Sequence, residues 1–394
     1  MKRILSTALA AVAVWGLRAQ NVNVVSAYNY LQDGNYAKAA EYIEPAISNE
    51  STMGKEKTWR YRGDIYRMIA MGEDQTLKSQ FPDALQKAID SYIKARELDA
   101  KKENERANIQ ALGALQIASL NAGNDAFTAK NYDQAVAYYE NSERIARAAG
   151  QVDSLAAFNK ALAYETKGDA AKAIEAYRSC LEMGYKKVDL YRFIAAQEKK
   201  RGNLDAAIAA VREGGAAFPG NKELIQDELA FLLDAGREAE VEPVVKAALE
   251  KDPCNATYHS ILASTYEKKA APEGAAVPAD AEQWLDQAEA SYKKAIECAP
   301  DFFDAYFNIG VLYNNRAATC YDKANAIKDN AQYNKAKAAC DAIYTKATPY
   351  FEKAHQLRPD DGPTIQQLMK LYAKTSDQAK YDEMKAKLEA LKGK

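Results

Sequence analysis

Histidine, the residue most often used in acid–base and metal chemistry, is scarce in this 394-residue chain, and its many carboxylates fall in charge runs typical of solvated helix faces. Its only two histidines, His259 and His355, have no second histidine or cysteine at the spacing of a metal site. We expect His259 at a buried position of one helix and His355 near the end of another, both in structural roles. Gly215 and Gly220 have the spacing of a phosphate-binding loop, but Asn221 stands where that loop requires a lysine. Since no HExxH or GxSxG motif occurs either, the sequence predicts no enzyme, no metal site and no cofactor.

The chain instead contains segments of similar sequence that indicate an internal repeat. Each segment begins with a glycine and then places small or apolar residues at helical spacing. The clearest examples are residues 34–46, 168–180, 202–214 and 236–248. Gly168, Gly202 and Gly236 follow one another at intervals of 34 residues. A period of this length is typical of stacked helical hairpins, and the abundant alanine also favours helix.

A second helix precedes each of these glycines and carries a small residue three positions before an aromatic one. The pairs are Ala161 and Tyr164, Ala263 and Tyr266, and Gly310 and Tyr313. The small residue lets two helices approach closely, and the aromatic ring fills the space beside it. The 25 tyrosines suggest carbohydrate stacking at first sight, but most of them fall at such packing positions.

This pattern resembles the tetratricopeptide repeat family, on segments such as AYFNIGVLYNNR (305–316) and ASYKKAIECAPD (290–301). The resemblance covers nearly all of the chain. It implies an all-α solenoid of stacked antiparallel helix pairs in about nine units. The expected units lie near 20–53, 56–102, 103–149, 154–187, 188–221, 222–255, 256–302, 303–361 and 362–394.

Several units exceed the plain period. The seventh gains an Ala-, Pro- and Gly-rich stretch over 268–282, either a long hairpin loop or a domain linker; we favour the loop. In the eighth we expect both helices of the pair to be longer, with the turn near Asn330. Residues 103–115 should lengthen the first helix of the third unit.

The cysteines give a geometric test of these hairpins, because antiparallel helices bring together residues equidistant from their turn. The midpoint of Cys320 and Cys340 falls at 330, and that of Cys254 and Cys298 falls at 276, inside the expected loop. We therefore predict two disulfides, Cys254–Cys298 and Cys320–Cys340. The alternative is five buried free thiols. Cys180 occupies a position where the repeat requires a small core residue, so we assign it to packing.

Residues 1–19 have the pattern of a secretory signal peptide. Lys2 and Arg3 precede an apolar stretch from Ile4 to Leu17, and cleavage is expected after Ala19. The alternative is an uncleaved membrane anchor, although the stretch is shorter than the roughly 20 residues that a span needs. We expect an exported protein, periplasmic or else extracellular, with no membrane span in the mature chain. A net charge of −2 without basic runs argues against nucleic acid as a partner.

In the family that this chain resembles, the first helices of the units line a concave groove that holds a peptide or a partner's helix. The residues on that face are therefore candidates for binding. They are Arg60, Arg67, Asn121, Asn124, Phe158, Asn159, Arg192, Phe193 and Asn308. An asparagine amide offers one donor group and one acceptor, which match a peptide unit of an extended ligand. The alternative is that these asparagines only satisfy neighbouring turns or helix ends.

We expect the function to be an exported protein–protein interaction scaffold that assists envelope assembly or secretion by binding a protein or peptide. One alternative is a glycan or peptidoglycan binder, which should show aromatic residues clustered with carboxylates on one exposed face. Another is a non-catalytic accessory subunit of an envelope enzyme, which should have a fixed partner. The sequence specifies neither the partner nor the oligomeric state.

Overall fold

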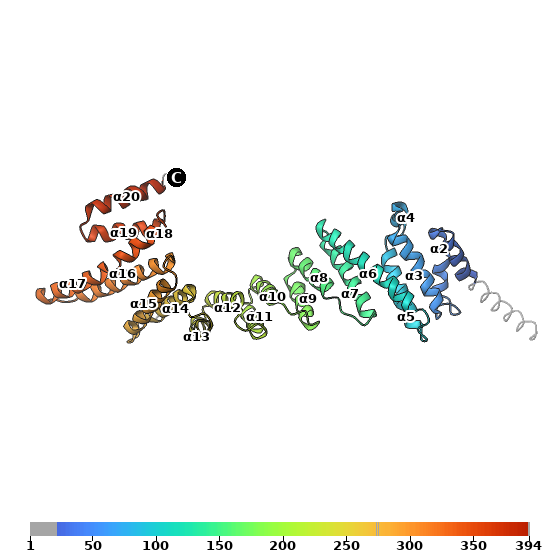
Figure 1. Cartoon of the computed structure of the whole chain (residues 1–394), viewed down its shortest axis with the longest axis horizontal. Helices are drawn as coiled ribbons and strands as arrows, with labels where there is room; N and C mark the ends of the chain where they lie inside the picture. Colours follow the sequence, from blue (N-terminus) through green and yellow to red (C-terminus); the bar gives the residue numbers. More distant parts are fainter. Residues whose placement is uncertain (1–21, 273, 275, 393–394) are drawn as a thin grey trace, which may run out of the picture. The chain divides into compact units, whose positions relative to one another are not determined.

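The computed structural model describes residues 22–272, 274 and 276–392. Over these residues every regular element is a helix (Figure 1). The expected signal peptide, residues 1–19, lies outside the described residues. No helix in the described part is both long and apolar enough to cross a membrane. The prediction of an all-α array of stacked helix pairs is confirmed.

The chain divides into two compact units, Met1–Ala210 and Val211–Lys394. The first unit starts with a helix over residues 22–32. It continues with α2 (Tyr36–Ile43), the 3₁₀ turn η1 (Glu44–Ile47), α3 (Glu56–Met71), α4 (Gln75–Gln80), α5 (Ala84–Leu98), α6 (Glu105–Thr128), α7 (Tyr132–Ala148), α8 (Ser154–Lys167), α9 (Ala170–Glu182) and α10 (Val188–Lys200). The next helix, α11 (Leu204–Ala217), contains the boundary between the units.

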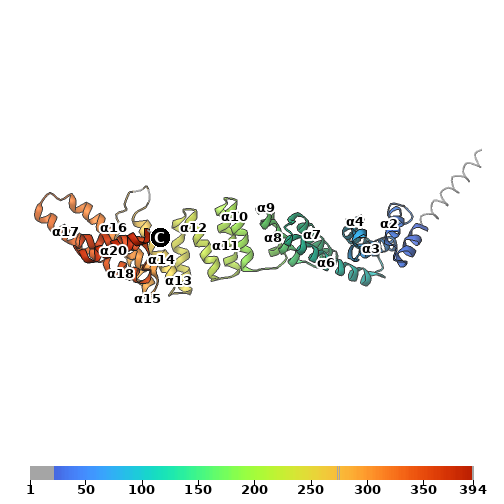
Figure 2. The same ribbon diagram turned by 90° about the horizontal axis from the view of Figure 1, so that it is seen from above.

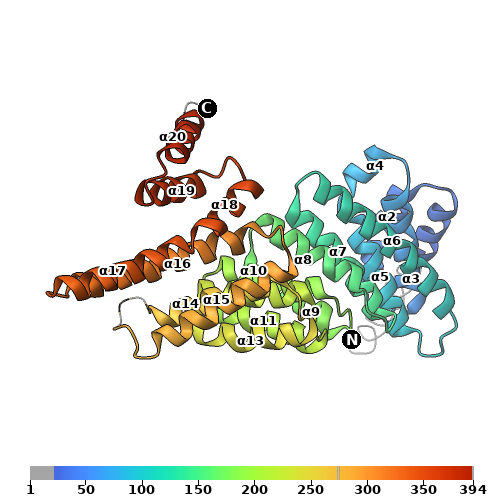
Figure 3. The same ribbon diagram turned by 60° about the vertical axis from the view of Figure 1, so that its left-hand side comes forward.

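The second unit consists of helices that are again joined in hairpins. They are α12 (Lys222–Asp234), α13 (Glu238–Lys251), α14 (Ala256–Ala270), α15 (Ala281–Cys298), α16 (Phe303–Asn325), α17 (Asn330–Thr345), α18 (Thr348–Leu357), α19 (Gly362–Lys374) and α20 (Gln378–Lys392). Within this unit α14 packs on α15, α16 on α17 and α19 on α20. In the first unit α3 packs on α5, α6 on α7 and α8 on α9 (Figure 3).

Polar side chains cap the start of several first helices, those of α8, α12, α14 and α19. The Asp153 carboxylate accepts a hydrogen bond from the Ala156 amide at 2.9 Å, and the Asn255 side chain accepts one from the Tyr258 amide at 3.1 Å. Each such cap satisfies an amide that has no partner inside the helix. First helices begin at Glu56, Ser154, Val188, Lys222, Ala256, Phe303 and Gly362. The division of the whole chain into nine repeat units stays a prediction.

The repeat glycines lie in the turn between the two helices of a pair. Gly168 ends α8 with φ 92°, and Gly34, Gly202 and Gly236 also have positive φ values, of 72°, 79° and 65°. An L-residue with a side chain rarely adopts this left-handed conformation, whereas glycine does so without steric cost. The 34-residue spacing seen in the sequence therefore marks equivalent helix ends.

Two other glycines allow close helix packing. A Cβ atom on Gly123 of α6 would lie 2.6 Å from Cε1 of Tyr139 on α7. A Cβ atom on Gly310 of α16 would lie 2.8 Å from Cζ of Phe351 on α18. Both rings are buried. These glycines thus leave room for an aromatic ring of another helix. The close approach expected at Gly310 is present, but the ring beside it is Phe351 of α18 and not Tyr313 of its own helix.

The enlarged units differ in how they accommodate their extra residues. The second unit, near 56–102, also contains extra residues, which form the short helix α4, and in the seventh unit the extra residues form the connection between α14 and α15. In the eighth repeat unit, the hairpin of α16 and α17 projects beyond the other helices of the second compact unit (Figures 1 and 2). The expectation that the second helix of the eighth pair is one long helix is wrong, because the chain after Asn330 forms two helices, α17 and α18, separated at Lys346 and Ala347. Pro349, which has no backbone N–H, stands in the first turn of α18, where that group is not required.

The cysteine pairs lie in the expected arrangement. Cys254 and Cys298 are at disulfide distance, with Cα atoms 5.2 Å apart, and so are Cys320 and Cys340, with Cα atoms 5.5 Å apart. Cys180 is a free thiol, fully buried in α9. Burial raises the pKa of that thiol to about 11, so it stays protonated at neutral pH. The Cys180 thiol is therefore a packing group.

Many buried tyrosines share one use of the hydroxyl group, which donates a hydrogen bond of 2.6–2.8 Å to a carboxylate on a neighbouring helix. The pairs are Tyr66–Glu44, Tyr92–Asp64, Tyr177–Glu165, Tyr292–Glu267, Tyr313–Glu289 and Tyr372–Glu352. Burial, and then the adjacent carboxylate, raise the pKa of each of these hydroxyls. These six tyrosines therefore hold helices together, three within a pair and three between successive pairs, and their buried rings are not available for carbohydrate stacking.

Candidate functional site

Two of the predicted binding residues, Arg60 and Arg67, line one cavity of about 320 Å³ between α3 and α6. They lie seven residues apart, on the same face of α3. Nε of Arg60 bonds to Glu56 at 2.9 Å, and Nε of Arg67 donates to the Tyr92 hydroxyl at 3.2 Å. Although burial opposes its charge, the bond to Tyr92 contributes to a raised pKa of Arg67. The cavity therefore has two permanently charged guanidinium groups in its wall.

The opposite wall of this cavity contains a buried amide. Asn108 of α6 is 0% exposed, and neither its amide oxygen nor its amide nitrogen has a hydrogen-bond partner. Leaving such a group unpaired costs about 1–3 kcal/mol. The sequence pattern did not single out Asn108, because it lies within residues 103–115, which lengthen the first helix of the third repeat unit beyond the repeat pattern.

Two of the candidate asparagines lie side by side farther along the first helices. Nδ2 of Asn159 on α8 is 3.5 Å from Oδ1 of Asn124 on α6. The same oxygen also accepts a hydrogen bond from the buried Tyr139 hydroxyl at 2.9 Å. Asn124 thus has an internal structural partner, and its binding role stays a prediction.

The aromatic candidates form one cluster on α8, α9 and α10. The ring of Phe158 lies 6.4 Å from that of Phe193, and Tyr177 lies 6.0 Å from Phe158 and 5.4 Å from Phe193, between ring centroids. Phe158 and Phe193 are both half-buried, so parts of these rings remain accessible to a ligand.

The other predicted candidates lie on α6, α10 and α16. Asn121 is exposed on α6. Arg192 is half-buried on α10 and has interactions of its own. Asn308 is half-buried on α16, in the second unit.

The histidines have structural surroundings, with one correction to the sequence analysis. His259 is half-exposed, and its Nε2 lies 2.9 Å from the carbonyl oxygen of Pro253, because the buried position of α14 belongs to Tyr258. Nε2 of His355 lies 3.0 Å from Nζ of Lys387 on α20. Burial, and then the charge of Lys387, lower the pKa of His355. Among the described residues no group of three or more His, Cys, Asp or Glu side chains is placed to hold a metal ion.

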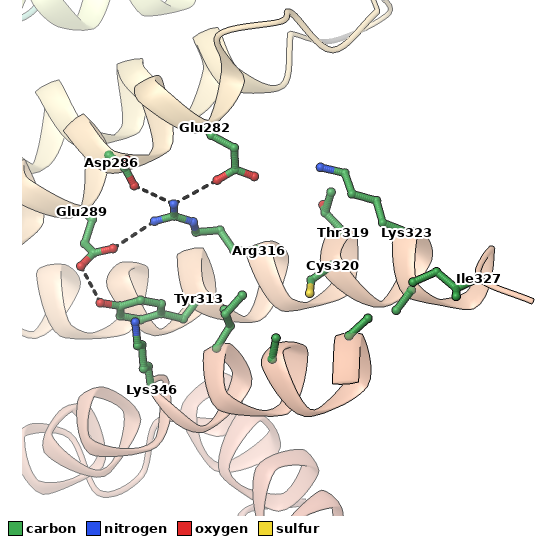
Figure 4. A pocket seen from close by; sticks show the side chains of 14 residues that line it. Glu282, Asp286, Glu289, Tyr313, Arg316, Thr319, Cys320, Lys323, Ile327 and Lys346 are labelled. Atoms are coloured by element: carbon green, nitrogen blue, oxygen red, sulfur yellow. Dashed lines mark hydrogen bonds and ion pairs between the residues drawn. The ribbon is translucent and has the colours of Figure 1, made fainter. Parts of the chain in front are cut away.

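A second and larger cavity, of about 610 Å³, lies in the second unit between α15, α16 and α17 (Figure 4). Its apolar part consists of Ala324, Ile327, Ala336, Ala339 and Ile343, next to Cys320 of the Cys320–Cys340 disulfide. Its polar part consists of Glu282, Asp286, Glu289, Tyr313, Arg316, Thr319, Lys323 and Lys346. The cavity thus combines a hydrophobic surface with side chains of both charges.

Arg316 is the central charged group of this cavity. Its guanidinium bonds to Glu282 at 3.0 Å, to Asp286 at 2.6 Å and to Glu289 at 3.0 Å (Figure 4). Burial opposes the charge, but hydrogen bonds with Asp286 and Glu282 raise the pKa of Arg316. Glu289 also accepts the Tyr313 hydroxyl bond at 2.7 Å. The three acidic residues that line the cavity are matched by three basic ones, Arg316, Lys323 and Lys346, so the rim carries charges of both signs and no net formal charge.

Comparisons with known proteins identify the repeat. Two models described as tetratricopeptide repeat match residues 120–184 and 291–338. The first match covers parts of α6 to α9, and the second covers parts of α15 to α17. The chain is a tetratricopeptide repeat protein. A comparison with curated protein sequences finds no match.

Solved structures of repeat proteins are also similar to parts of the chain. A TPR repeats protein from Bacteroides fragilis is 22% identical, with 66% of this chain and 98% of that chain covered and a TM-score of 0.34. The C-terminal part of a TPR repeat-containing protein from Cytophaga hutchinsonii is 13% identical, with 69% and 95% covered and a TM-score of 0.45. YrrB, described as a TPR protein with an unusual peptide-binding site, is 19% identical, with 48% and 88% covered and a TM-score of 0.33.

The repeat pattern of this tetratricopeptide repeat protein does not reveal the Arg316 cluster. A signal for it does exist, because Glu282, Asp286 and Glu289 are spaced four and three residues apart and so share one face of α15. Their arginine partner comes from the next hairpin, which only the packing of α15 on α16 brings within reach.

Proposed function

We propose that this chain is an exported interaction scaffold that binds segments of partner proteins and assists the assembly or secretion of envelope proteins. The observation that carries the proposal is the cavity between α15, α16 and α17, where an apolar surface adjoins a charged rim. Protein recognition sites combine these features, because apolar contact supplies affinity and polar groups supply orientation. Tetratricopeptide repeats provide the rigid framework that holds such a surface ready for binding.

The position of this cavity favours a peptide segment or a helix as the ligand. The hairpin of α16 and α17 projects beyond its neighbours, and several of the apolar residues that line the cavity belong to this projection. Within the rim, Arg316 is already held by acidic groups of α15. A partner therefore meets charges that are fixed before binding, which lowers the ordering cost.

Two features support export. The signal-like residues 1–19 are one of them. The other is the presence of two cysteine pairs at disulfide distance, since disulfides persist in oxidising compartments. We propose that the exported protein is located in the periplasm.

Site-specific photo-crosslinking in intact cells tests the proposal. A photoreactive amino acid is placed at Thr319, an exposed residue that lines the cavity. The matched control is Asn334, which is exposed on the same hairpin but does not line the cavity. We expect a small set of envelope proteins to crosslink through Thr319 and not through Asn334. Equal products from both positions, or none from Thr319, would contradict a binding role for the cavity.

The same experiment separates the alternatives. A single partner recovered in fixed proportion would indicate an accessory subunit of an enzyme. Several partners that share an extended segment would indicate a scaffold. Recovery of glycan fragments alone would favour the carbohydrate alternative, for which the buried tyrosines, with their hydroxyls paired to carboxylates, offer no support.

A further inference from the structure

We infer that the Cys320–Cys340 disulfide controls the cavity between α15, α16 and α17, which persists while this bond is intact and is lost when a dithiol reduces it. The inference rests on the proposed binding function and adds the regulation of that same site. Its basis is the packing of α17, which the bond joins to α16.

Helix α17 has almost no hydrophobic core of its own. All 16 of its residues belong to the described part of the chain, and Cys340, at 0% exposed, is the only one that is buried. The helix packs mainly on α16, and in the part of α16 beyond Cys320 only Ala324 is buried. An isolated helix of about 15 residues is marginal in water. The order of α17 therefore depends on what ties it to α16.

The other contacts of α17 lie at its accessible surface. The Tyr321 hydroxyl on α16 donates a hydrogen bond to Asp341. The ammonium group of Lys374, an exposed residue of α19, lies 3.4 Å from the ring centroid of Tyr321 and 4.4 Å from that of Tyr344. Such contacts stabilise a helix only weakly, because water competes for the exposed groups. The buried disulfide is therefore the main tie between α17 and α16.

Helix α17 forms one wall of the cavity. It contributes Ala336, Ala339 and Ile343 to the lining. None of these three side chains is buried, because they face the cavity and not a packed core. When α17 separates from α16, the cavity loses this apolar wall.

The disulfide can be reached from the cavity. Cys320 is half-buried and lines the cavity (Figure 4), whereas Cys340 is fully buried. A thiolate of the dithiol attacks Sγ of Cys320, the Cys320–Cys340 bond breaks, and Sγ of Cys340 leaves with the electron pair and takes up a proton. The second sulfur of the dithiol, once deprotonated, attacks the mixed disulfide. This step releases Cys320, which takes up that proton, and leaves the dithiol oxidised to a disulfide.

The other disulfide provides a matched control. Cys254 and Cys298 join the start of α14 to the end of α15. These two helices also pack on each other through buried side chains, among them Leu262, Tyr266 and Tyr292. We therefore expect α14 and α15 to stay paired without their disulfide.

Hydrogen exchange of the purified full chain, measured by mass spectrometry, tests the inference without any partner. The sample is the variant Cys254→Ala/Cys298→Ala, before and after reduction of its Cys320–Cys340 bond by dithiothreitol. These two cysteines are 20 residues apart. By the loop-entropy model, loss of such a bond should make opening of α17 about a hundredfold more frequent. We expect exchange in α17 peptides to rise by about this factor while α14 and α15 peptides keep their protection. Unchanged exchange in α17 would overturn the inference.

Photo-crosslinking through Thr319 in intact cells extends the test to binding. Crosslinked products should be lost in Cys320→Ala/Cys340→Ala and retained in Cys254→Ala/Cys298→Ala. Products that persist in Cys320→Ala/Cys340→Ala would overturn control of the site by the disulfide. Absence of products from the wild-type chain would instead contradict the proposed function, and this failure is distinguishable because the exchange measurement needs no partner.

Discussion

Substitution of two glycines in α6 by alanine should change stability in opposite directions. Gly113 has no atom within 4 Å of an added Cβ, whereas a Cβ on Gly123 would lie 2.6 Å from Cε1 and 2.8 Å from Cδ1 of Tyr139. Alanine is more favourable than glycine inside a helix by about 1 kcal/mol. Gly113→Ala should therefore stabilise the first unit by up to about 1 kcal/mol. In Gly123→Ala the same gain is opposed by overpacking, which costs about 1–3 kcal/mol.

Because both glycines lie in the same helix, the propensity term cancels when the two variants are compared. The difference in unfolding free energy between them should therefore be about 1–3 kcal/mol, the cost of the steric conflict alone. Urea unfolding followed by circular dichroism measures this difference, and hydrogen exchange of α6 and α7 peptides locates it. The ring of Tyr139 cannot move aside freely, because it is buried and its hydroxyl bonds to Asn124.

A double variant provides the internal check. Tyr139→Leu alone should destabilise the unit by leaving a cavity, but in that background Gly123→Ala should no longer be unfavourable. If Gly123→Ala is as stable as Gly113→Ala in the wild-type background, the close packing of α6 on α7 is refuted.

Three further predictions concern the cysteines and two titratable contacts. Under denaturing conditions without reductant, mass spectrometry after thiol labelling should find one labelled cysteine, Cys180. Five labelled cysteines would exclude both disulfides. Each disulfide should contribute roughly 3–4 kcal/mol to the free energy of unfolding. Since the pKa of His355 is lowered beside Lys387, its protonation should weaken the docking of α20 as the pH falls below about 6.5. The protection factors of α20 amides, which correct for the pH dependence of intrinsic exchange, should therefore be lower at pH 5.5 than at pH 7.5, and a His355→Gln variant should lose that difference. Burial raises the pKa of Glu267 although Tyr292 donates a bond to it. Tyr292→Phe should therefore cost about 1–3 kcal/mol at pH 8, where Glu267 is ionised, and less as the pH falls and Glu267 takes up a proton. An equal loss at every pH in urea titrations would contradict this.

The helix pairs could be predicted from the sequence because their signals are local. Gly168 and Gly202 mark helix ends through a backbone conformation that glycine adopts without cost, and Asp153 marks a helix start through its own side chain. The cysteine pairs followed from the same locality, since residues equidistant from one turn must meet. The break between α17 and α18 was missed because alanine and lysine continue through it, and the only local signal is Pro349, which a helix tolerates in its first turn.

The cavities could not be predicted in the same way, because their chemistry depends on contacts between hairpins. Arg316 becomes a fixed charge only where α16 packs beside the acidic face of α15. Asn108 looks like an ordinary helix residue in the sequence, and it becomes informative only when packing buries its amide and supplies no partner. A repeat pattern specifies which residues must be alike from unit to unit. The residues that distinguish one repeat protein from another are therefore those that the repeat does not require, and the extension of α6 that carries Asn108 is such a departure in this chain.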